Sequence, residues 1–337
     1  MAPYLGELLS NSCADHIGAT PLVRLNRLPT SFKIRARICA KLEFFNAAGS
    51  VKDRIAKSMV EQAELDGQIK PGDTLIEASS GNTGIAIALM AAIKGYKCII
   101  VLSEKMSLEK EQILRALGAS VVRTPAGVPI KSPDSILCVA RRLKEEIPNS
   151  WILDQYNNPE NPRAHEYGTA EEIWHQTEGR VDILIAGAGT GGTVTGLARG
   201  LKKKGRNVSV VGVDPIGSIL AHPEELNEER SEYKVEGIGY DFVPGVLDRT
   251  APDIWIKTND RDAFRLARRL VRDEGILCGG SSGAAFAGLL QYLSMHPEDN
   301  VEDKTIVLIF PDSLRNYLTK FADDSWMETN GFAGETD

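Results

Sequence analysis

The sequence lacks long apolar runs, paired cysteines and metal-ligand spacings. No stretch approaches the ~18 uninterrupted apolar residues of a membrane-spanning helix, so no membrane partner is expected. The five cysteines, at positions 13, 39, 98, 138 and 278, are odd in number and include no CxxC pair. A disulfide framework and a structural zinc site are therefore not expected. The histidines show no metal spacing either, so we expect no metal.

Basic charge is also scarce. The 39 Lys and Arg residues against 46 Asp and Glu residues give a net charge of −7. A duplex-DNA binder normally presents a basic face, so nucleic acid is not an expected partner. The lysine run 202–204 ends a predicted helix, where it offsets the helix dipole. The N-terminus has no basic segment followed by a long apolar one, so no secretory signal is expected. Together with free cysteines this predicts a cytoplasmic protein.

The 337 residues, 42% of them hydrophobic, suffice for about two domains or subdomains. Short β-branched runs alternate with helical patterns, which predicts an α/β fold with parallel sheets covered by helices on both sides. Strands are expected at 74–77, 98–102, 120–122, 183–186, 208–213 and 305–309. Helices are expected near 52–66, 82–94, 107–117, 134–146, 192–204, 261–274 and 283–295.

The first glycine-rich segment precedes the predicted helix near residue 52. Gly49 and Ser50 come before it, and Ser50 is expected as its N-cap. Lys52 would then lie in the first turn, where the positive end of the helix dipole disfavours a cation. If it is also desolvated, its pKa falls, which suits Schiff-base chemistry.

Two further glycine-rich segments each lead from a strand into a helix. In residues 77–84, main-chain amides and the hydroxyls of Ser79, Ser80 and Thr83 would face one spot that fits a carboxylate or phosphate. Residues 187–193 form a denser anion cradle. They also satisfy GxGxxG, and Asp214 follows at the distance of a ribose-binding acid, so a dinucleotide site is an alternative.

Taken together, one phosphate cradle, one activated lysine and one carboxylate-sized cradle favour a phosphorylated aldehyde cofactor. Pyridoxal 5′-phosphate, held by a lysine, has this chemistry. The dinucleotide alternative leaves Lys52 and residues 79–83 unexplained.

Several of these segments, in this order, resemble the cysteine synthase/cystathionine β-synthase family of fold type II pyridoxal-phosphate enzymes. The resemblance covers roughly residues 15–330 and rests on GATPLVRL from residue 18, GSVKDR from 49, SSGNTG from 79, GAGTGGT from 187 and GGSSG from 279. It implies two parallel-type sheets flanked by helices, with a smaller mobile subdomain. Within the family, the cystathionine β-synthase branch is the more similar, on LDQY from 153, EGIGYDF from 236 and PDSLRNY from 311.

The resemblance implies a role for each matching residue. Lys52 would bind the cofactor covalently and move the proton, and Tyr156 and Tyr240 would assist catalysis. The other cofactor contacts would be Asn82, Gly189, Thr190, Gly191, Gly192, Thr193 and Ser281. Substrate would be bound by Ser79, Ser80, Gly81, Thr83, Gln155, Gly237, Gly239 and Tyr240.

The activity implied is condensation of L-serine with L-homocysteine to L-cystathionine and water. A cysteine synthase or cyanoalanine synthase type of β-replacement, on O-acetylserine or cysteine, is the near alternative. An NAD-binding enzyme and a non-catalytic sensor are remote ones. The family resemblance also implies a homodimer.

The same resemblance sets the expected domain boundaries. Residues 1–14 would be an N-terminal segment and 15–330 the catalytic core, with the smaller subdomain at about 85–160. Residues 331–337 would be a loose tail. No haem is expected, because the family core begins at about residue 15, and the chain ends before a C-terminal regulatory module.

Overall fold

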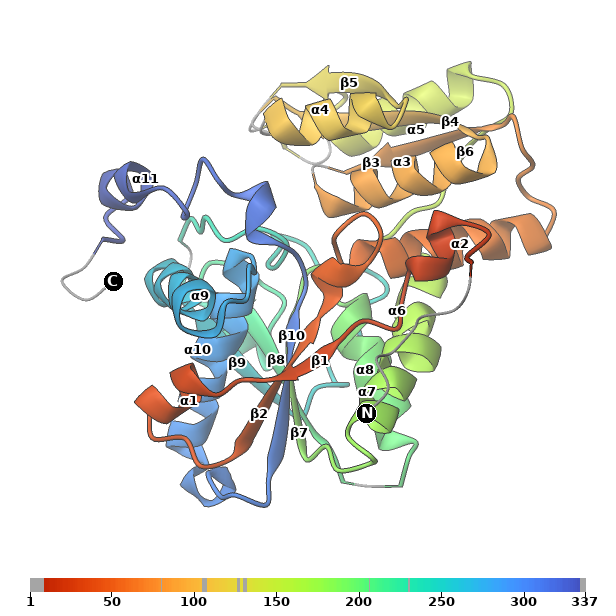
Figure 1. The fold of residues 1–337 in the computed structure, drawn as a ribbon. Coiled ribbons are helices and arrows are strands. Elements are labelled where there is room, and N and C mark those ends of the chain that lie inside the picture. Colours follow the sequence, from red (N-terminus) through yellow and green to blue (C-terminus); the bar gives the residue numbers. More distant parts are fainter. Residues whose placement is uncertain are drawn as a thin grey trace. The chain divides into compact units, whose positions relative to one another are not determined.

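The computed structural model describes residues 9–333 except 80, 105–107, 126–127, 130–131, 206 and 230. The chain divides into two compact units, which are described separately (Figure 1). Unit 1 comprises Met1–Ala19, Asn46–Ala48 and Lys52–Leu153; unit 2 comprises Thr20–Phe45, Gly49–Val51 and Asp154–Asp337. The expected bounds of the catalytic core and of a smaller subdomain at about 85–160 stay a prediction.

Unit 1 is a parallel α/β sheet. Its four strands lie in the order β5-β4-β3-β6 and all pair in parallel. They are β3 Thr74–Ala78, β4 Lys97–Ser103, β5 Ser120–Thr124 and β6 Ser150–Ile152. The helices are α2 Lys52–Leu65, α3 Asn82–Lys94, α4 Leu108–Ala116 and α5 Ile136–Glu146. Helices α3 and α4 lie on one face of the sheet and α5 on the other (Figure 1).

This arrangement follows from right-handed crossovers. The chain moves outward from β3 through β4 to β5, and then returns past β3 to β6. The direction therefore reverses between β3 and β6. In open α/β sheets the crevice at such a reversal, at the carboxyl ends of the strands, is where ligands bind.

Unit 2 contains a six-stranded sheet in the order β1-β2-β10-β7-β8-β9, parallel except for β1. The strands are β1 Leu22–Arg24, β2 Arg37–Leu42, β7 Ile183–Gly187, β8 Ser209–Pro215, β9 Ile254–Thr258 and β10 Thr305–Phe310. The helices are α1 Arg27–Ser31, α6 Glu160–Ala164, α7 Ala170–Gln176, α8 Gly192–Lys202, α9 Asp260–Glu274, α10 Gly280–Met295 and α11 Asp324–Thr329, and a π-helical turn, His165–Thr169, joins α6 to α7.

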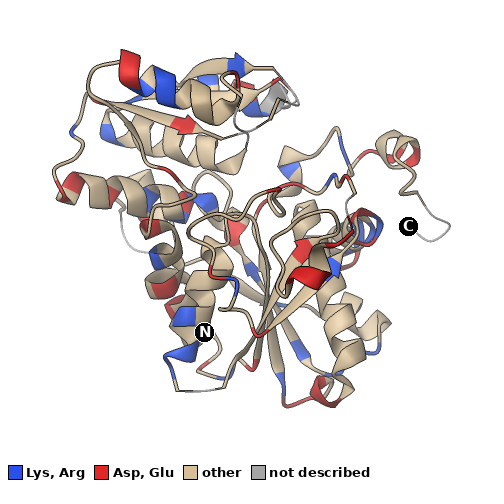
Figure 2. Cartoon of the chain, turned by 180° about the vertical axis from the view of Figure 1, so that it is seen from behind, with Lys and Arg blue, Asp and Glu red and all other residues tan. Residues whose placement is uncertain are grey.

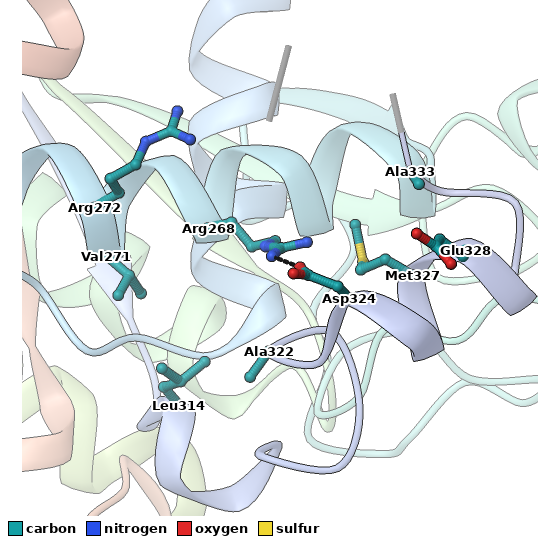
Figure 3. Close-up of a pocket in the computed structure, with 9 residues that line it drawn as sticks. All are labelled: Arg268, Val271, Arg272, Leu314, Ala322, Asp324, Met327, Glu328 and Ala333. Carbon is teal, nitrogen blue, oxygen red and sulfur yellow. Dashed lines mark hydrogen bonds and ion pairs between the residues drawn. The ribbon is translucent and has the colours of Figure 1, made fainter. Parts of the chain in front are cut away.

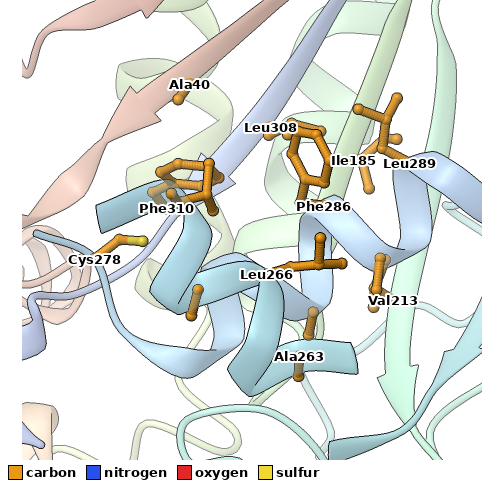
Figure 4. Close-up of a cluster of buried hydrophobic side chains, with 14 of the residues drawn as sticks. Ala40, Ile185, Val213, Ala263, Leu266, Cys278, Phe286, Leu289, Leu308 and Phe310 are labelled. Carbon is orange, nitrogen blue, oxygen red and sulfur yellow. The ribbon is translucent and has the colours of Figure 1, made fainter. Parts of the chain in front are cut away.

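Helices cover both faces of this sheet, as expected for parallel strands. On one face α9 and α10 enclose a core in which Phe286 of α10 and Leu266 of α9 pack with Leu308 and Phe310 of β10 (Figure 4). On the other face α8 buries Val194 and Leu197 against the sheet. The strand order reverses between β10 and β7, so the loops after these two strands mark the switch point of unit 2.

Glycines at every fourth position let α8 approach α6 and the π-helical turn very closely. A Cβ on Gly192 would lie 1.8 Å from Asn161 Oδ1, and one on Gly196 would lie 2.2 Å from the Pro162 carbonyl oxygen. A Cβ on Gly200 would lie 2.5 Å from Ala170 Cβ. Because residues four apart share one helix face, the three glycines form a single contact stripe. We call Gly192, Gly196 and Gly200 the glycine stripe.

Charged side chains of both signs are interspersed over the ribbon (Figure 2). The lysines at the end of α8 each pair with an acidic residue: Lys202 with Asp253 at 2.7 Å, Lys204 with Glu171 at 2.5 Å, and Lys203 with Glu166. In the part of the chain that the structure describes, no helix is long and apolar enough to cross a bilayer.

The two ends of the chain lie only partly within the described residues. Of the expected N-terminal segment, residues 1–8 lie outside the described residues, and a 3₁₀ turn spans Cys13–His16. Of the expected loose tail, residues 334–337 lie outside them. Phe332 packs on Phe264 and Trp326, with ring centroids 5.3 and 5.8 Å apart.

The glycine stripe predicts a stability effect. Gly200→Ala should lower the free energy of unfolding by about 1–2 kcal/mol, because the overpacking penalty of about 1–3 kcal/mol exceeds the ~1 kcal/mol gain in helix propensity. Urea unfolding of the purified protein measures this. Lys202→Ala, on the exposed end of the same helix, should change it by less than about 1 kcal/mol. A Gly200→Ala protein as stable as the parent would show that the contact is not tight.

Candidate active site

The loop of residues 188–191, after β7, lies at the switch point of unit 2. Gly191 has φ +83°, which favours glycine, and a Cβ there would lie 2.4 Å from Leu247 Cδ1. A Cβ on Gly189 would lie 2.4 Å from the Gly237 carbonyl oxygen. The loop leads into α8, whose first amides have no partner within the helix. Backbone amides without side chains over them make an anion cradle.

Asn161 clamps this loop from α6. Its Nδ2 donates to the Gln155 carbonyl oxygen at 2.7 Å and to Thr190 Oγ1 at 2.9 Å, and its side chain is 1% exposed. Gln155 is itself buried. One amide therefore joins two of the predicted site residues, Gln155 and Thr190.

His165 supports the loop at its helical end. Its Nε2 lies 3.2 Å from Thr193 Oγ1, and its Nδ1 lies 3.0 Å from Thr169 Oγ1. His165 belongs to the π-helical turn, a conformation often found at functional sites.

The segment 237–240 lies against the same loop. The Gly239 amide donates to the Ala188 carbonyl oxygen at 2.8 Å. Next to it, the rings of Tyr156, Tyr240 and Phe242 contact one another, with centroids 5.0–5.7 Å apart. The structure thus brings Gly237, Gly239, Tyr240 and Tyr156 together with the glycine-rich loop. We call Tyr156, Tyr240 and Phe242 the aromatic group.

Asp312, which follows β10, connects two more predicted segments. Its carbonyl oxygen accepts from the Gly279 amide at 3.0 Å, and it pairs as an isolated bridge with Ser50. The Tyr317 hydroxyl donates to Asp312 Oδ2 at 2.5 Å, and burial together with the Asp312 charge raises the pKa of Tyr317 well above its usual value. The start of α10, with buried Ser281, is therefore fixed at the carboxyl end of β10.

Lys52 comes directly after residues 49–51 in the sequence. The Val51 amide donates to the Pro311 carbonyl oxygen at 2.8 Å, so residues 49–51 are attached to the loop after β10. Lys52 is the next residue and begins α2, which confirms its placement in the first turn. Ser50, two residues before the start of α2, pairs with Asp312 in an isolated bridge, and its role as the N-cap stays a prediction.

In unit 1, the second glycine-rich segment lies at the reversal between β3 and β6. Asn82 is the first residue of α3, Gly81 is its cap residue, and the Gly81 amide donates to Ser79 Oγ at 3.3 Å. Ser79 and Thr83 are buried. Ser80 lies outside the described residues. This segment and Lys52 belong to unit 1, and the other predicted site residues belong to unit 2.

The structure removes the support for a dinucleotide site. Asp214 would have to face a ribose, but its side chain is fully buried and its Oδ2 bonds Lys257 at 2.7 Å.

Burial raises the pKa of Cys278 to about 12, so this thiol near α10 is not a nucleophile at neutral pH. Among the described residues, no cluster of His, Cys, Asp and Glu could hold a metal ion.

One pocket lies elsewhere, between α9 and α11. It has a volume of about 520 Å³ and is lined by Arg268 and Arg272 of α9 and by Asp324 and Met327 of α11 (Figure 3). Arg268 is paired with Asp324. None of the predicted site residues lines this pocket.

A model of the pyridoxal-phosphate dependent enzyme family matches residues 13–312. The chain belongs to this family. Cystathionine β-synthase of Rattus norvegicus is 57% identical over 95% of this chain and 56% of its own length. That of Saccharomyces cerevisiae is 54% identical over 94% of this chain and 64% of its own length. The chain thus spans between half and two thirds of the length of these curated relatives.

Solved structures give the same fold. A cysteine synthase from Entamoeba histolytica superposes with a TM-score of 0.85 and 37% identity, covering 93% of this chain and 90% of that one. A hydrogen sulfide-producing enzyme from Fusobacterium nucleatum superposes with a TM-score of 0.83 and 38% identity, covering 92% and 100%.

The residues present fit the cofactor of the family. The glycines of residues 188–193 let this loop pack closely on Gly237, Leu247 and Asn161, and the loop leads into the first amides of α8, which suit a phosphate. Ser281, 3% exposed in the first turn of α10, offers a hydroxyl, and Lys52 offers an amine.

Sequence reasoning missed four neighbours of this site: Asn161, His165, Phe242 and Asp312. A single polar residue has no local pattern, and of these four only Phe242, within EGIGYDF, and Asp312, within PDSLRNY, stood in segments that drew attention.

The Asn161 clamp predicts a loss of cofactor affinity. Asn161→Ala leaves the buried Thr190 hydroxyl without its amide partner, at a cost of about 1–3 kcal/mol, which corresponds to a rise of about 5- to 150-fold in the Kd for pyridoxal 5′-phosphate. Titration of the apoprotein, followed by absorbance, measures this.

Asn157→Ala is the matched control, because the exposed Asn157 bonds only Asp154 in the same segment, at 2.8 Å. It should bind the cofactor like the parent. Equal affinities for all three proteins would contradict the clamp.

Proposed function

We propose that the chain condenses L-serine with L-homocysteine to L-cystathionine and water, as a pyridoxal-phosphate dependent lyase. The observation that carries the proposal is the aromatic group beside the glycine-rich loop, with Tyr240 and Tyr156 in contact. A small residue in place of Tyr240 would suit a smaller nucleophile such as sulfide. The identity of 54–57% to cystathionine β-synthases supports it.

When bound, pyridoxal phosphate supplies an electron sink for the pair left at the substrate Cα. The protein must then hold the cofactor and move protons. We assign both tasks at the reacting centre to Lys52, whose Nζ holds the cofactor and, once freed, takes the proton from Cα. The same amine protonates the leaving hydroxyl, because hydroxide is a poor leaving group without an acid.

We assign the remaining cofactor contacts on the similarity to the family, residue by residue. Amides and hydroxyls of Gly189, Thr190, Gly191, Gly192 and Thr193 bind the phosphate at the start of α8. Ser281 gives the pyridine nitrogen a neutral hydroxyl partner rather than a carboxylate, which favours elimination over transamination. Asn82, the first residue of α3, donates to the ring oxygen.

Substrate selection is assigned to two segments. The serine carboxylate is bound by the segment after β3, with Ser79, Ser80, Gly81 and Thr83, and by Gln155. The second substrate enters past Gly237, Gly239 and Tyr240. Tyr156 positions the leaving hydroxyl or the incoming thiol. The π faces of the aromatic group provide an apolar wall for the methylene groups of homocysteine.

A cysteine synthase activity on O-acetylserine is the second candidate. It is favoured by the TM-scores of 0.83–0.85 to a cysteine synthase and to a hydrogen sulfide-producing enzyme. The identity to these proteins is 37–38%, lower than to the cystathionine β-synthases.

We also propose a cytoplasmic homodimer. The five cysteines are free, and those at 39, 98 and 278 are buried, which suits a reducing compartment. Sedimentation equilibrium of the holoenzyme tests the dimer.

The decisive assay compares two substrate pairs in the purified holoenzyme. With serine and homocysteine, kcat/KM should exceed that with O-acetylserine and sulfide, and the product should be cystathionine by mass spectrometry. The reverse preference would assign the chain to the cysteine synthases.

Lys52→Ala should lower the turnover of serine and homocysteine by at least about 1,000-fold, because both proton transfers lose their base and acid. Lys57→Ala, on the same helix with its Nζ bonded to the Ala14 carbonyl oxygen at 3.0 Å, is the matched control and should retain activity. Near-normal turnover by Lys52→Ala would contradict the assignment.

A further inference from the structure

A buried polar network lies behind Tyr240 and serves none of the steps above. It starts at Lys257 of β9, whose Nζ donates to Asp214 Oδ2 at 2.7 Å, to the Ser218 carbonyl oxygen at 2.8 Å and to Asn227 Oδ1 at 3.3 Å. The ammonium group thus uses all three of its hydrogens. The Lys257 side chain is 12% exposed and that of Asp214 is fully buried.

Asp214 fixes the loop that follows β8. Besides Lys257, its Oδ2 accepts from the amides of Leu220 and Ala221, both at 3.2 Å. A buried carboxylate is retained only with such partners, and removing one is strongly destabilising. The loop of residues 216–221 is therefore held between β8 and β9.

Ser218, in this loop, is hydrogen-bonded to the backbone of Tyr240. The Tyr240 amide donates to Ser218 Oγ at 3.0 Å, and the same Oγ donates to the Tyr240 carbonyl oxygen at 3.1 Å. That carbonyl also accepts from the Ile219 amide at 3.0 Å. One fully buried hydroxyl thus engages both backbone polar groups of Tyr240.

We propose that Ser218, Lys257 and Asp214 are positioning residues that hold Tyr240 for the thiol substrate. Ser218 fixes the backbone of Tyr240, and the hydrogen bond from Gly239 to Ala188 fixes the residue before it. The ring of Tyr240 is therefore already in position, and binding of the second substrate costs little conformational entropy. This inference rests on the role proposed above for Tyr240. It adds residues that never touch substrate but set its affinity.

Ser218→Ala is the test variant, because truncating Lys257 leaves the buried Asp214 carboxylate without its counter-charge and destabilises the fold. In the holoenzyme, the KM for homocysteine should rise about tenfold, a shift that matches loss of one well-formed hydrogen bond, while kcat and the KM for serine change less than about twofold. Hydrogen exchange of the Tyr240 amide should accelerate.

Thr177→Val is the matched control. It also removes a buried hydroxyl from unit 2, one that donates to the Ile173 carbonyl oxygen at 2.8 Å, and should leave both KM values and Tyr240 exchange unchanged. In a Tyr240→Ala background, Ser218→Ala should raise the KM for homocysteine no further, because no ring remains to be positioned.

An unchanged KM for homocysteine, an equal rise of both KM values, or full additivity with Tyr240→Ala would overturn the proposal. Failure of the proposed function is seen separately, as a parent holoenzyme that makes no cystathionine. In that case sulfide replaces homocysteine as the second substrate. The role of Ser218 is then decided by whether Ser218→Ala raises the KM for sulfide and accelerates hydrogen exchange of the Tyr240 amide.

Discussion

The close packing of α8 on α6 and the π-helical turn is the constraint on which the candidate site depends. Helix α8 can approach only because the glycine stripe presents no Cβ to Asn161, Pro162 and Ala170. This approach fixes the axis of α8, and with it the direction in which its first amides point. It also brings Asn161 within hydrogen-bonding distance of Thr190. A packing contact and an anion cradle are therefore one feature of the structure.

Two buried aspartates extend this order to the other segments of unit 2. Asp312, after β10, connects residue 50 with the start of α10, while Asp214, at the end of β8, fixes the loop behind Tyr240. Both lie at carboxyl ends of central strands, where parallel sheets leave backbone amides unpaired and ligands bind. Asp214 connects its loop through its carboxylate, which accepts from two amides, whereas Asp312 connects residues 50 and 279 through its backbone. The sheet thus sets the position of the site, and the two aspartates attach its loops to the strand ends.

The sequence predicted the parts of the fold that have local signals. The starts of α3 at Asn82 and α8 at Gly192 agree with the structure to the residue, because a β-branched run, glycines and a helical pattern follow one another there. Strands β1 and β6, of three residues each, and the longer strands β2 and β9 were missed, and β2 and β9 share one cause. Each contains a lysine that interrupts the apolar run, and each lysine is buried by a partner distant in sequence: Lys41 pairs with Glu172 at 2.6 Å, and Lys257 pairs with Asp214.

The same reasoning explains which parts of the site could be predicted. Motif residues such as Lys52 and Thr190 carry their signal in the surrounding glycines. Asn161 does not, since its partner Thr190 lies 29 positions away and no spacing rule connects them. Phe242 was included in a motif but was not singled out, because it contacts Tyr156, a residue that is distant in sequence.

The central claim is that the glycine-rich start of α8 binds the cofactor phosphate. It is tested most directly by comparing the affinity of the apoprotein for pyridoxal 5′-phosphate and for pyridoxal, in the parent, in Gly192→Ala and in the control Asn157→Ala. The account predicts that the parent and Asn157→Ala prefer the phosphorylated form at least about 100-fold, and that Gly192→Ala loses most of this preference. An equal loss of affinity for both compounds in Gly192→Ala, with the preference intact, would contradict it.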